Sequence, residues 1–174
     1  MKVIHHAANT QGRDLVVGDL HGCRSLFDDV LRQAAFDPCR DRVFCVGDLM
    51  DRGPDSIACL QLLNEPWFYP VYGNHEDLLV RLIDATMRRD TDRRAYDHAV
   101  RDVMDNGGSK WMDPQNTMRP SIPEAVWAYA ESVRSLPLVR CVGERDNRFN
   151  VVHAELYDFH SLDGVVTDAR LDTN

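Results

Sequence analysis

The sequence predicts an α/β protein whose first strands are parallel, and two observations lead to this prediction. Between residues 15 and 83, a short apolar run, a glycine-containing polar turn and a helical pattern follow one another three times. Parallel strands need long crossover connections, usually helices, so this repeated order is typical of a parallel sheet. The second observation is that each apolar run ends close to an Asp, Asn or His. Because ligands of such sheets gather beyond the carboxyl ends of the strands, we expect the functional residues there.

The first unit consists of the apolar run 15–17, the turn 18–22 and a helical pattern. The spacing of its apolar residues predicts a helix that buries one face, formed by Leu26, Val30, Leu31 and Ala34. In the second unit, the run 42–46 is followed by a turn that ends in Gly53. Pro54 then stands where the first residue of a helix is expected, and the apolar stripe continues through Ile57, Leu60 and Leu63.

The third unit begins with a strand predicted over 68–71, which runs into the turn 73–76. A helix follows, and its apolar face is expected to contain Leu78, Leu79, Leu82 and Ile83. Another helix is expected over 91–105, because the sequence Asn106-Gly107-Gly108 is a typical helix stop.

The last part of the chain predicts a loop, a helix and a hairpin. Residues 109–121 contain two prolines and indicate the loop, and the helix is expected over 123–135. The segments 138–142 and 149–152 have the composition of strands and are separated by a polar turn, so they predict the hairpin. The second of these strands leads directly to His153.

Length and composition restrict the class of protein. A chain of 174 residues, 44% of them hydrophobic, is enough for one globular domain, and we expect a single domain over residues 1–174. The net charge of −8 argues against binding to nucleic acid or to an anionic membrane. Because no apolar run approaches the roughly 20 residues of a membrane span and the polar start is no secretory signal, we expect a cytoplasmic protein. The five cysteines include no CxxC pair and are interpreted as buried or incidental thiols.

The side chains near the strand ends form a set of oxygen and nitrogen donors, whose members are Asp19, His21, Asp48, Asn74 and His153. Carboxylate, imidazole and amide oxygen together suit Mn²⁺, Fe or Zn²⁺. A carboxylate has two oxygens, so Asp48, in the middle of the set, is expected to bridge two metal ions. Two metals about 3.5–4 Å apart can hold the attacking and leaving oxygens of a phosphoryl displacement and acidify a bound water.

Three further residues complete the groups that a phosphoesterase needs. Arg52 is the type of residue that forms paired hydrogen bonds with phosphate oxygens. His75 directly follows Asn74 and is placed to protonate the leaving alkoxide as a general acid, with Asp51 holding its ring in the required tautomer. The residues alone therefore predict a metal-dependent phosphoesterase. The structural alternatives are that His75 caps its helix and that His153 packs in the core.

Three motifs resemble those of a known family, and they are Gly18-Asp19-Leu20-His21-Gly22, Gly47-Asp48-Leu49-Met50-Asp51-Arg52-Gly53 and Gly73-Asn74-His75-Glu76. They are similar to the GDxHG, GDxxDRG and GNHE signature of the phosphoprotein-phosphatase branch of the metallophosphoesterases. Three motifs in this order, each after a predicted strand, are a specific signal. The sequence most resembles the bacterial and bacteriophage-lambda-type serine/threonine protein phosphatases, also over the segments 65–68, 106–111 and 152–155. The resemblance covers roughly residues 12–160.

The resemblance implies a fold and a metal centre. The implied fold is a β-sandwich flanked by helices. Asp19, His21 and the bridging Asp48 would hold the first metal ion. Asp48, Asn74 and His153 would hold the second. Mn²⁺ is the usual activating ion of the bacterial members.

It also implies an activity, which is hydrolysis of phosphoserine and phosphothreonine in proteins by hydroxide held between the two metals. Arg52 and Asn74 would bind the substrate phosphate, and His75, paired with Asp51, would protonate the leaving group. A symmetrical diadenosine tetraphosphate hydrolase is the nearest alternative, because its signature begins alike. The segments 65–68 and 106–108 favour the protein phosphatase.

Two features of the family pattern have no match. Members carry a further metal-binding histidine in a GHT-type motif and an additional arginine before it, whereas only 21 residues follow His153 and they contain no GHT. His160 lies too near His153 for the family spacing, and the neighbours of Arg170 do not match. We therefore expect either a C-terminally incomplete fragment that lacks the last strands, or a second metal held by three protein ligands and water. A catalytically impaired remnant that acts as a binding module is the third functional alternative.

Overall fold

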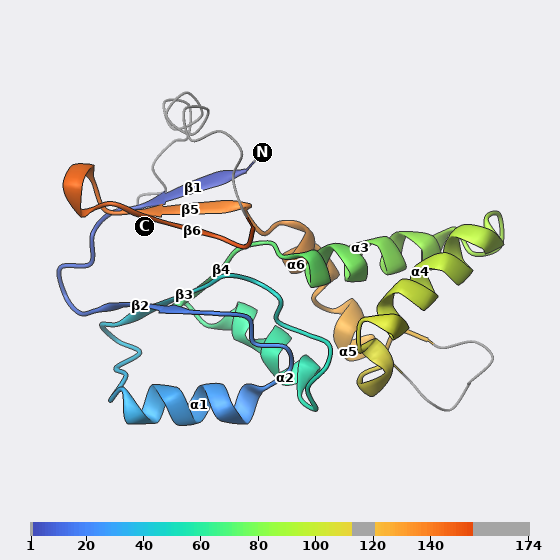
Figure 1. Cartoon of the computed structure of the whole chain (residues 1–174), viewed down its shortest axis with the longest axis horizontal. Coiled ribbons are helices and arrows are strands. Elements are labelled where there is room, and N and C mark those ends of the chain that lie inside the picture. The colour runs from blue at the N-terminus through green and yellow to red at the C-terminus, as the bar shows by residue number, and fades with distance from the viewer. Residues whose placement is uncertain (1, 113–120, 155–174) are drawn as a thin grey trace.

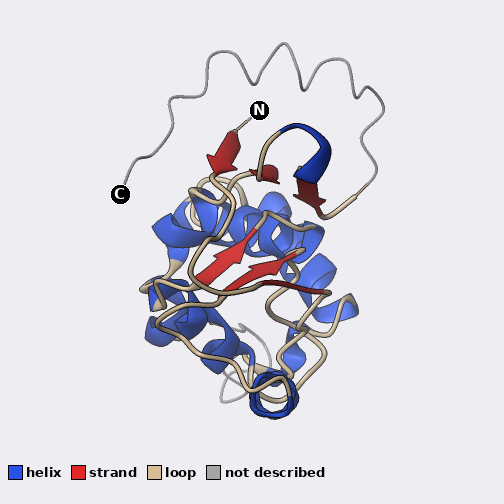
Figure 2. Cartoon of the chain, turned by 90° about the vertical axis from the view of Figure 1, so that its left-hand side faces the viewer, coloured by secondary structure: helices blue, strands red, loops and turns tan. Residues whose placement is uncertain are grey.

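The structure, a computed structural model, describes residues 2–112 and 121–154. In these ranges the strands form two three-stranded sheets, one above the other, with the helices gathered around one of them (Figures 1 and 2). The first sheet has the order β2-β3-β4 and is parallel throughout, with strands at Asp14–Val17, Arg42–Cys45 and Phe68–Pro70. This arrangement confirms the α/β class and the parallel order of the first three predicted strands.

The second sheet has the order β1-β5-β6, with strands at Val3–His6, Val139–Val142 and Phe149–Val152. β5 and β6 are antiparallel, as the predicted hairpin requires. β1 pairs with β5 in parallel and was not predicted. Two histidines follow its apolar residues, and its partner strand lies near the other end of the described chain, so no local pattern marks it.

The two sheets pack face to face, which confirms the β-sandwich. Buried side chains from strands and strand ends of both sheets form the layer between them, and these are Phe44, Val71, Val142 and Val151. The ring centroid of Phe44 on β3 lies 5.9 Å from that of Phe149 on β6. A larger apolar cluster lies between the first sheet and the helices.

Helices connect the strands of the first sheet and extend beyond it. α1 (Arg24–Gln33) joins β2 to β3, and α2 (Ser56–Leu60) with the 3-10 turn η1 (Gln61–Asn64) joins β3 to β4. α3 (Asn74–Met87) and α4 (Arg93–Asp105) form a helical hairpin that projects to one side (Figure 1). Shorter helical segments follow at η2 (Gly108–Lys110), α5 (Glu124–Trp127), α6 (Ala130–Arg134) and η3 (Arg145–Asn147).

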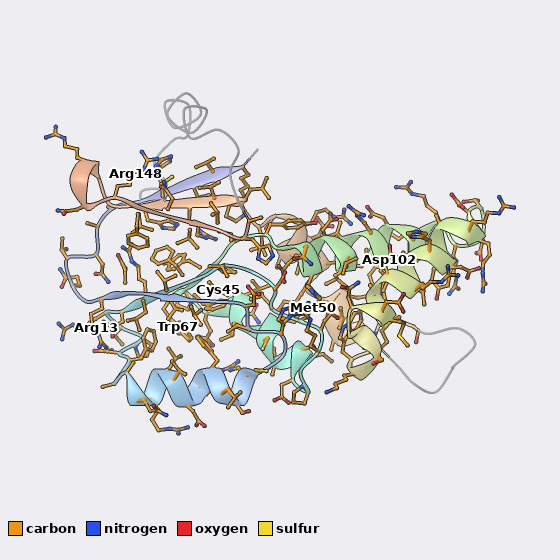
Figure 3. All side chains as sticks on the ribbon, viewed as in Figure 1. Arg13, Cys45, Met50, Trp67, Asp102 and Arg148 are labelled. Carbon is orange, nitrogen blue, oxygen red and sulfur yellow. The ribbon has the colours of Figure 1, made fainter. Side chains whose placement is uncertain are left out.

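The buried face of α1 agrees with the predicted one at Leu31, which packs against the main core, and differs from it at Leu26 and Val30. Leu26 and Val30 are 63% and 56% exposed, whereas Phe27 is only 4% exposed. Phe27 stacks with Trp67, at a centroid distance of 6.5 Å, and Trp67 lies between α1 and the first sheet (Figure 3). The helix therefore directs Phe27 and Leu31 toward the sheet, because Trp67 on that side packs against Phe27.

Two other helix boundaries were predicted wrongly. α2 begins at Ser56 and not at Pro54, because the N–H of Asp55 donates to the carbonyl of Gly22 (2.8 Å) and ties this segment to the first motif loop. The helix expected over 123–135 is divided into α5 and α6. The division falls at Tyr129, whose hydroxyl accepts a hydrogen bond from Asn64 at 2.8 Å.

Several sequence predictions about helix ends and cysteines agree with the structure. α4 ends at Asp105, and Gly107 has the left-handed backbone (φ 96°) that a glycine after a helix supplies. All five cysteines are free. None of the helices in the described ranges is long and apolar enough to cross a membrane. Most of the loop predicted over 109–121 lies outside the described residues.

Candidate metal centre

Loops that follow β2, β3 and β4 supply most of the candidate site. Because these strands are parallel, their carboxyl ends lie at one edge of the sheet and the loops after them are neighbours. Asp19 and His21 follow β2, Asp48 follows β3, and Asn74 is the first residue of α3. The N–H groups of Leu20 and His21 both donate to the carbonyl oxygen of Asp48, at 3.1 and 2.8 Å. The backbone thus joins the first two loops directly.

The Asp48 carboxylate lies at the centre of the cluster and is almost fully buried. Its Oδ2 is 3.7 Å from Nε2 of His21, and its Oδ1 is 3.5 Å from Nε2 of His153. Two sets of donors, each within 4.8 Å, share this carboxylate: His21, Asp48 and His75 form one, and Asp19, Asp48 and His153 form the other. Asp48 therefore occupies the central position expected from the sequence.

Asp19, Asn74 and His153 also belong to the cluster. The Asp19 carboxylate lies 3.7 Å from Nε2 of His21 and 3.9 Å from Nδ1 of His153. Oδ1 of Asn74 lies 2.8 Å from Nε2 of His153. The structure thus brings together the five side chains predicted as metal ligands, although they come from loops on both sheets.

Two backbone carbonyls orient the imidazole rings. Nδ1 of His21 donates to the carbonyl of Met50 (3.1 Å), and Nδ1 of His153 donates to the carbonyl of Val46 (2.8 Å). The ring of His21 therefore presents an unprotonated Nε2 toward Asp48, which is the state in which imidazole binds a metal. Nε2 of His153 faces both Oδ1 of Asn74 (2.8 Å) and Oδ1 of Asp48 (3.5 Å). Carboxylate, imidazole and amide oxygens held in this way fit a divalent cation such as Mn²⁺, Fe²⁺ or Zn²⁺.

A buried His–Asp pair lies beside the cluster. Nδ1 of His75 is 2.6 Å from Oδ2 of Asp51, and both side chains are buried. The other ring nitrogen, Nε2, faces the cluster and lies 3.8 Å from Oδ2 of Asp48. Asp51 therefore holds the ring of His75 in one orientation, with Nε2 directed at the metal-binding groups, as a positioned general acid requires.

Arg52 is exposed and covers this part of the site. Its guanidinium nitrogens lie 2.7 Å from Nε2 of His21 and 3.2 Å from Nε2 of His75. Since a guanidinium has only donors, both ring nitrogens act as acceptors here. Arg52 brings a positive charge to a place otherwise lined by acidic and neutral groups, where an incoming anion would meet it.

Four motif residues have a left-handed backbone, which is unusual for side chains other than glycine. Their φ angles are 42° at His21, 51° at Asp48, 70° at Asp51 and 63° at Arg52. Such conformations cost about 1–3 kcal/mol each and tend to occur at functional sites. In the described ranges these four stand among six non-glycine residues with such a backbone, and the other two, Ala35 and Arg145, lie outside the motifs.

Glu76 supports the site and had no predicted role. Its carboxylate accepts hydrogen bonds from the N–H groups of Asp48, Leu49 and Gly73, each at 2.8 Å. Burial raises the pKa of this carboxyl group. A side chain at Gly73 would clash, since its Cβ would lie 2.3 Å from Oδ1 of Asp48. The signal in the sequence was the position of Glu76 as the last residue of the third motif.

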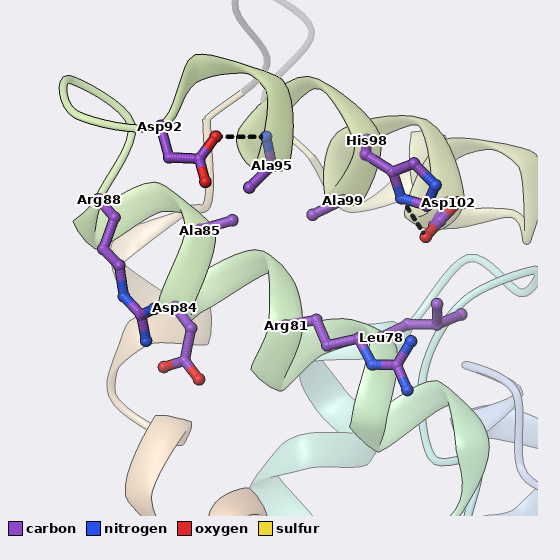
Figure 4. A pocket seen from close by; sticks show the side chains of 10 residues that line it. All are labelled: Leu78, Arg81, Asp84, Ala85, Arg88, Asp92, Ala95, His98, Ala99 and Asp102. Atoms are coloured by element: carbon purple, nitrogen blue, oxygen red, sulfur yellow. Dashed lines mark hydrogen bonds and ion pairs between the residues drawn. The ribbon is translucent and has the colours of Figure 1, made fainter.

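A groove of about 390 Å³ lies between α3 and α4, formed by residues further along these helices (Figure 4). Its walls carry Arg81, Arg88 and the ion pair between His98 and Asp102 (2.9 Å). It shares no residue with either donor set. His160 and Arg170, which were considered as additional site residues, lie outside the described residues.

A sandwich whose strand ends hold a cluster of aspartates and histidines defines a metallophosphoesterase. The chain belongs to the calcineurin-like phosphoesterase family, whose model matches residues 13–174. It is 36% identical over 140 residues to serine/threonine-protein phosphatase 1 of Salmonella typhimurium, which covers 80% of this chain and 57% of that protein. It is 34% identical over 91 residues to the symmetrical bis(5'-nucleosyl)-tetraphosphatase of Dechloromonas aromatica, covering 51% of this chain and 32% of that protein.

A crystal structure of a proposed diadenosine tetraphosphatase has a similar fold. The TM-score is 0.52 at 29% sequence identity, and the match covers 81% of this chain and 50% of that chain. The present chain thus spans about half the length, or less, of the relatives named here. The relatives carry the names of two different phosphoesterases.

Proposed function

We propose that this chain hydrolyses phosphoserine and phosphothreonine in proteins with the help of two divalent metal ions. The observation that supports the proposal most strongly is that the Asp48 carboxylate belongs to two donor sets at once. A carboxylate with one oxygen directed at each set is suited to hold two cations side by side. Asp19, His21 and Asp48 would bind the first cation, and Asp48, Asn74 and His153 the second. This assignment moves Asp19, which lies 3.7 Å from His21 and 3.9 Å from His153, out of the donor set with His153, and it keeps His75 of the other set as the general acid.

The ions would most suitably be Mn²⁺, with Fe and Zn²⁺ as alternatives, because the donors mix oxygen and nitrogen. When bound, two such ions stabilise the charge that develops on a phosphoryl group and lower the pKa of a bound water. Among the described residues, the two donor sets contain no serine, threonine or cysteine that could attack the phosphorus. Cys45, the nearby thiol, is buried, and burial raises its pKa.

The side chains around the metal ligands would bind and protonate the substrate. Arg52 and Asn74 would hold phosphate oxygens, with the guanidinium offering paired donors. In its imidazolium form, His75 would deliver the Nε2 proton to the leaving alkoxide and keep the Nδ1 proton that is bonded to Asp51. Asp51, bonded to Nδ1 at 2.6 Å, would keep the ring in place and stabilise its charged form.

A phosphoprotein is the favoured substrate, because the likeness to the Salmonella protein phosphatase extends over 80% of the chain. Symmetrical cleavage of diadenosine tetraphosphate is the second candidate. It is supported by the likeness to the Dechloromonas enzyme and to the crystal structure described above.

The test is a chromatographic assay of the full chain with Mn²⁺, a phosphoserine peptide and diadenosine tetraphosphate. We expect phosphate release from the peptide, and we expect Asp48→Asn to reduce it by more than about 100-fold, because metal charge stabilisation contributes several kcal/mol. Asp29→Asn, an exposed aspartate of α1 paired with Arg32, is the matched control and should keep full activity.

Three results would contradict the proposal in different ways. Exclusive cleavage of the dinucleotide would identify the second candidate as correct. Turnover of both substrates at the Asp48→Asn level, with metal bound, would identify a binding module. Fewer than two metal ions per chain by elemental analysis would reject the dinuclear centre.

A further inference from the structure

Both carboxylate oxygens of Asp51 have a hydrogen-bond donor. Oδ2 is bonded to Nδ1 of His75 at 2.6 Å, and Oδ1 accepts a hydrogen bond from the indole Nε1–H of Trp111. Asp51 is 1% exposed and Trp111 6% exposed, so water does not compete for these contacts. Trp111 lies 60 residues from Asp51 in the sequence.

We propose that Trp111 is a positioning residue for the general acid. By holding Oδ1, it fixes the plane of the Asp51 carboxylate, and Oδ2 then fixes the ring of His75. This inference rests on the proposed phosphoesterase function, in which His75 donates the proton to the leaving oxygen. The side-chain hydrogen bond of Trp111 goes to Asp51, which is not one of the residues assigned as metal ligands.

The backbone around Trp111 is tied to the same loop. The N–H of Arg52 donates to the carbonyl of Gly107 at 3.1 Å, and the N–H of Trp111 donates to the carbonyl of Gly108 at 3.2 Å. A side chain at Gly107 would place its Cβ 2.8 Å from the nitrogen of Arg52, so only glycine allows this approach. The glycines that end α4 therefore do more than stop a helix, because they bring η2 and Trp111 against Asp51 and Arg52.

The chemistry of the indole fits a positioning role. Indole N–H is a donor only and carries no charge, so it satisfies Oδ1 and leaves the negative charge of Asp51 available to His75. A buried carboxylate oxygen without a donor would cost free energy and would draw in water or rotate to another partner. Ser56 holds the other side of the residue, since its Oγ accepts a hydrogen bond from the backbone N–H of Asp51 at 3.0 Å.

The inference predicts an effect that depends on the leaving group. A substrate such as 2,4-dinitrophenyl phosphate releases a stable anion and needs no proton from His75. Phenyl phosphate releases a more basic oxygen and depends on the general acid, whose contribution is commonly about 100-fold or more. A residue that only maintains the fold would change both rates alike.

We therefore compare Trp111→Phe with Trp127→Phe, a matched change at a partly buried tryptophan of α5. With Mn²⁺, Trp111→Phe should lower kcat for phenyl phosphate by at least about 10-fold and that for 2,4-dinitrophenyl phosphate by less than about 2-fold. Trp127→Phe should change the two values equally or not at all. An equal loss on both substrates in Trp111→Phe would overturn the inference.

A second measurement does not require activity. The proton on Nδ1 of His75, held by Asp51, should give a far-downfield resonance in the NMR spectrum of the metal-free chain. We expect this resonance to broaden or vanish in Trp111→Phe and to persist in Trp127→Phe. An unchanged resonance in Trp111→Phe would overturn the inference.

The two measurements separate this inference from the proposed function. A wild-type chain that cleaves no aryl phosphate would reject the function, while the resonance would still decide whether Trp111 positions His75. Should Trp111→Phe fail to fold, 3-benzothienylalanine at position 111 replaces the N–H by sulfur in a side chain of nearly the same shape. This variant, too, should lose kcat selectively on phenyl phosphate and should lose the downfield resonance of His75.

Discussion

His153 and Asn74 meet at the junction of the two sheets, with Nε2 of the histidine 2.8 Å from Oδ1 of the asparagine, although 79 residues separate them. Asn74 begins the helix that follows the first sheet, and His153 follows the last strand of the second. The cluster around Asp48 thus depends on the docking of one sheet on the other. Neither sheet alone contains the full set of donors predicted for the second metal ion.

His153→Asn should remove one metal site and leave the other. The donors assigned to the first ion, around His21, do not include His153, so its binding should persist. Isothermal titration calorimetry with Mn²⁺ should show two binding sites in the wild type and one in the variant. His98→Asn, at an exposed histidine of α4, is the control and should keep both. Two unaltered sites in His153→Asn would show that His153 is not a ligand.

Glu76→Gln should loosen the metal centre. The amide replaces one acceptor oxygen by a donor, and three buried N–H groups then compete for a single oxygen. We expect the free energy of unfolding to fall by about 2–3 kcal/mol and the affinity for Mn²⁺ to fall about 10-fold or more. Urea unfolding and metal titration measure these two effects. Glu131→Gln, at a 90% exposed side chain, should change neither, and equal behaviour of the two variants would refute the role of Glu76.

Phe27→Ala and Leu26→Ala should differ greatly in stability. Phe27 is buried against Trp67, so its truncation should lower the free energy of unfolding by about 3–5 kcal/mol. Leu26 is 63% exposed, and its truncation should change the value by less than about 0.5 kcal/mol. Chemical denaturation of both variants tests which face of α1 is buried. A larger loss of stability in Leu26→Ala than in Phe27→Ala would show that the face predicted from the sequence, which contains Leu26, is the buried one.

His6 should make the chain less stable in acid. Burial, followed by the charges of Arg140 and Arg42, lowers the pKa of His6 to about 4. Its Nε2 accepts a hydrogen bond from Arg140 at 3.0 Å, which protonation would remove, and the other charged neighbours are Asp14 and His5. The unfolded chain binds this proton near pH 6.5 and the folded chain only near 4, so stability should rise with pH between these values.

The variant His6→Gln keeps an acceptor for Arg140 but does not titrate. Between pH 4 and pH 6.5 the free energy of unfolding should therefore rise by about 2 kcal/mol less in His6→Gln than in the wild type, after allowance for solvent screening. Urea unfolding at a series of pH values measures the difference. His98→Gln is the matched control, because His98 is 72% exposed. Parallel pH profiles for wild type and His6→Gln would contradict the prediction.

The local patterns of the sequence were sufficient for the first sheet and for the positions of the motif residues. Each motif begins within three residues of the end of a strand, so the order of Asp19, Asp48 and Asn74 along the chain already places them at one sheet edge. His153 could be proposed for the same reason, as the residue after a strand. These relationships need only parallel pairing and short connections.

The features that were missed depend on partners far away in the sequence. β1 is a strand because β5 pairs with it. The buried face of α1 is decided by Trp67, which lies on another segment, while both Leu26 and Phe27 are apolar enough to be buried. Similarly, Trp111 reaches Asp51 only because Gly107 lets α4 end against Arg52. No spacing rule within a single helix or strand contains this information.

The left-handed backbone at His21, Asp48, Asp51 and Arg52 means that the reactive part of the molecule works against its own folding. Glycine at any of these positions would relax the main chain and at the same time remove the chemistry. Leu49 and Met50 lie between the strained residues Asp48 and Asp51, and their side chains are fully buried. The burial of these two side chains offsets the free-energy cost of the strained backbone. Arg52 is the exposed residue of the four, so Arg52→Gly should raise the free energy of unfolding and at the same time reduce activity.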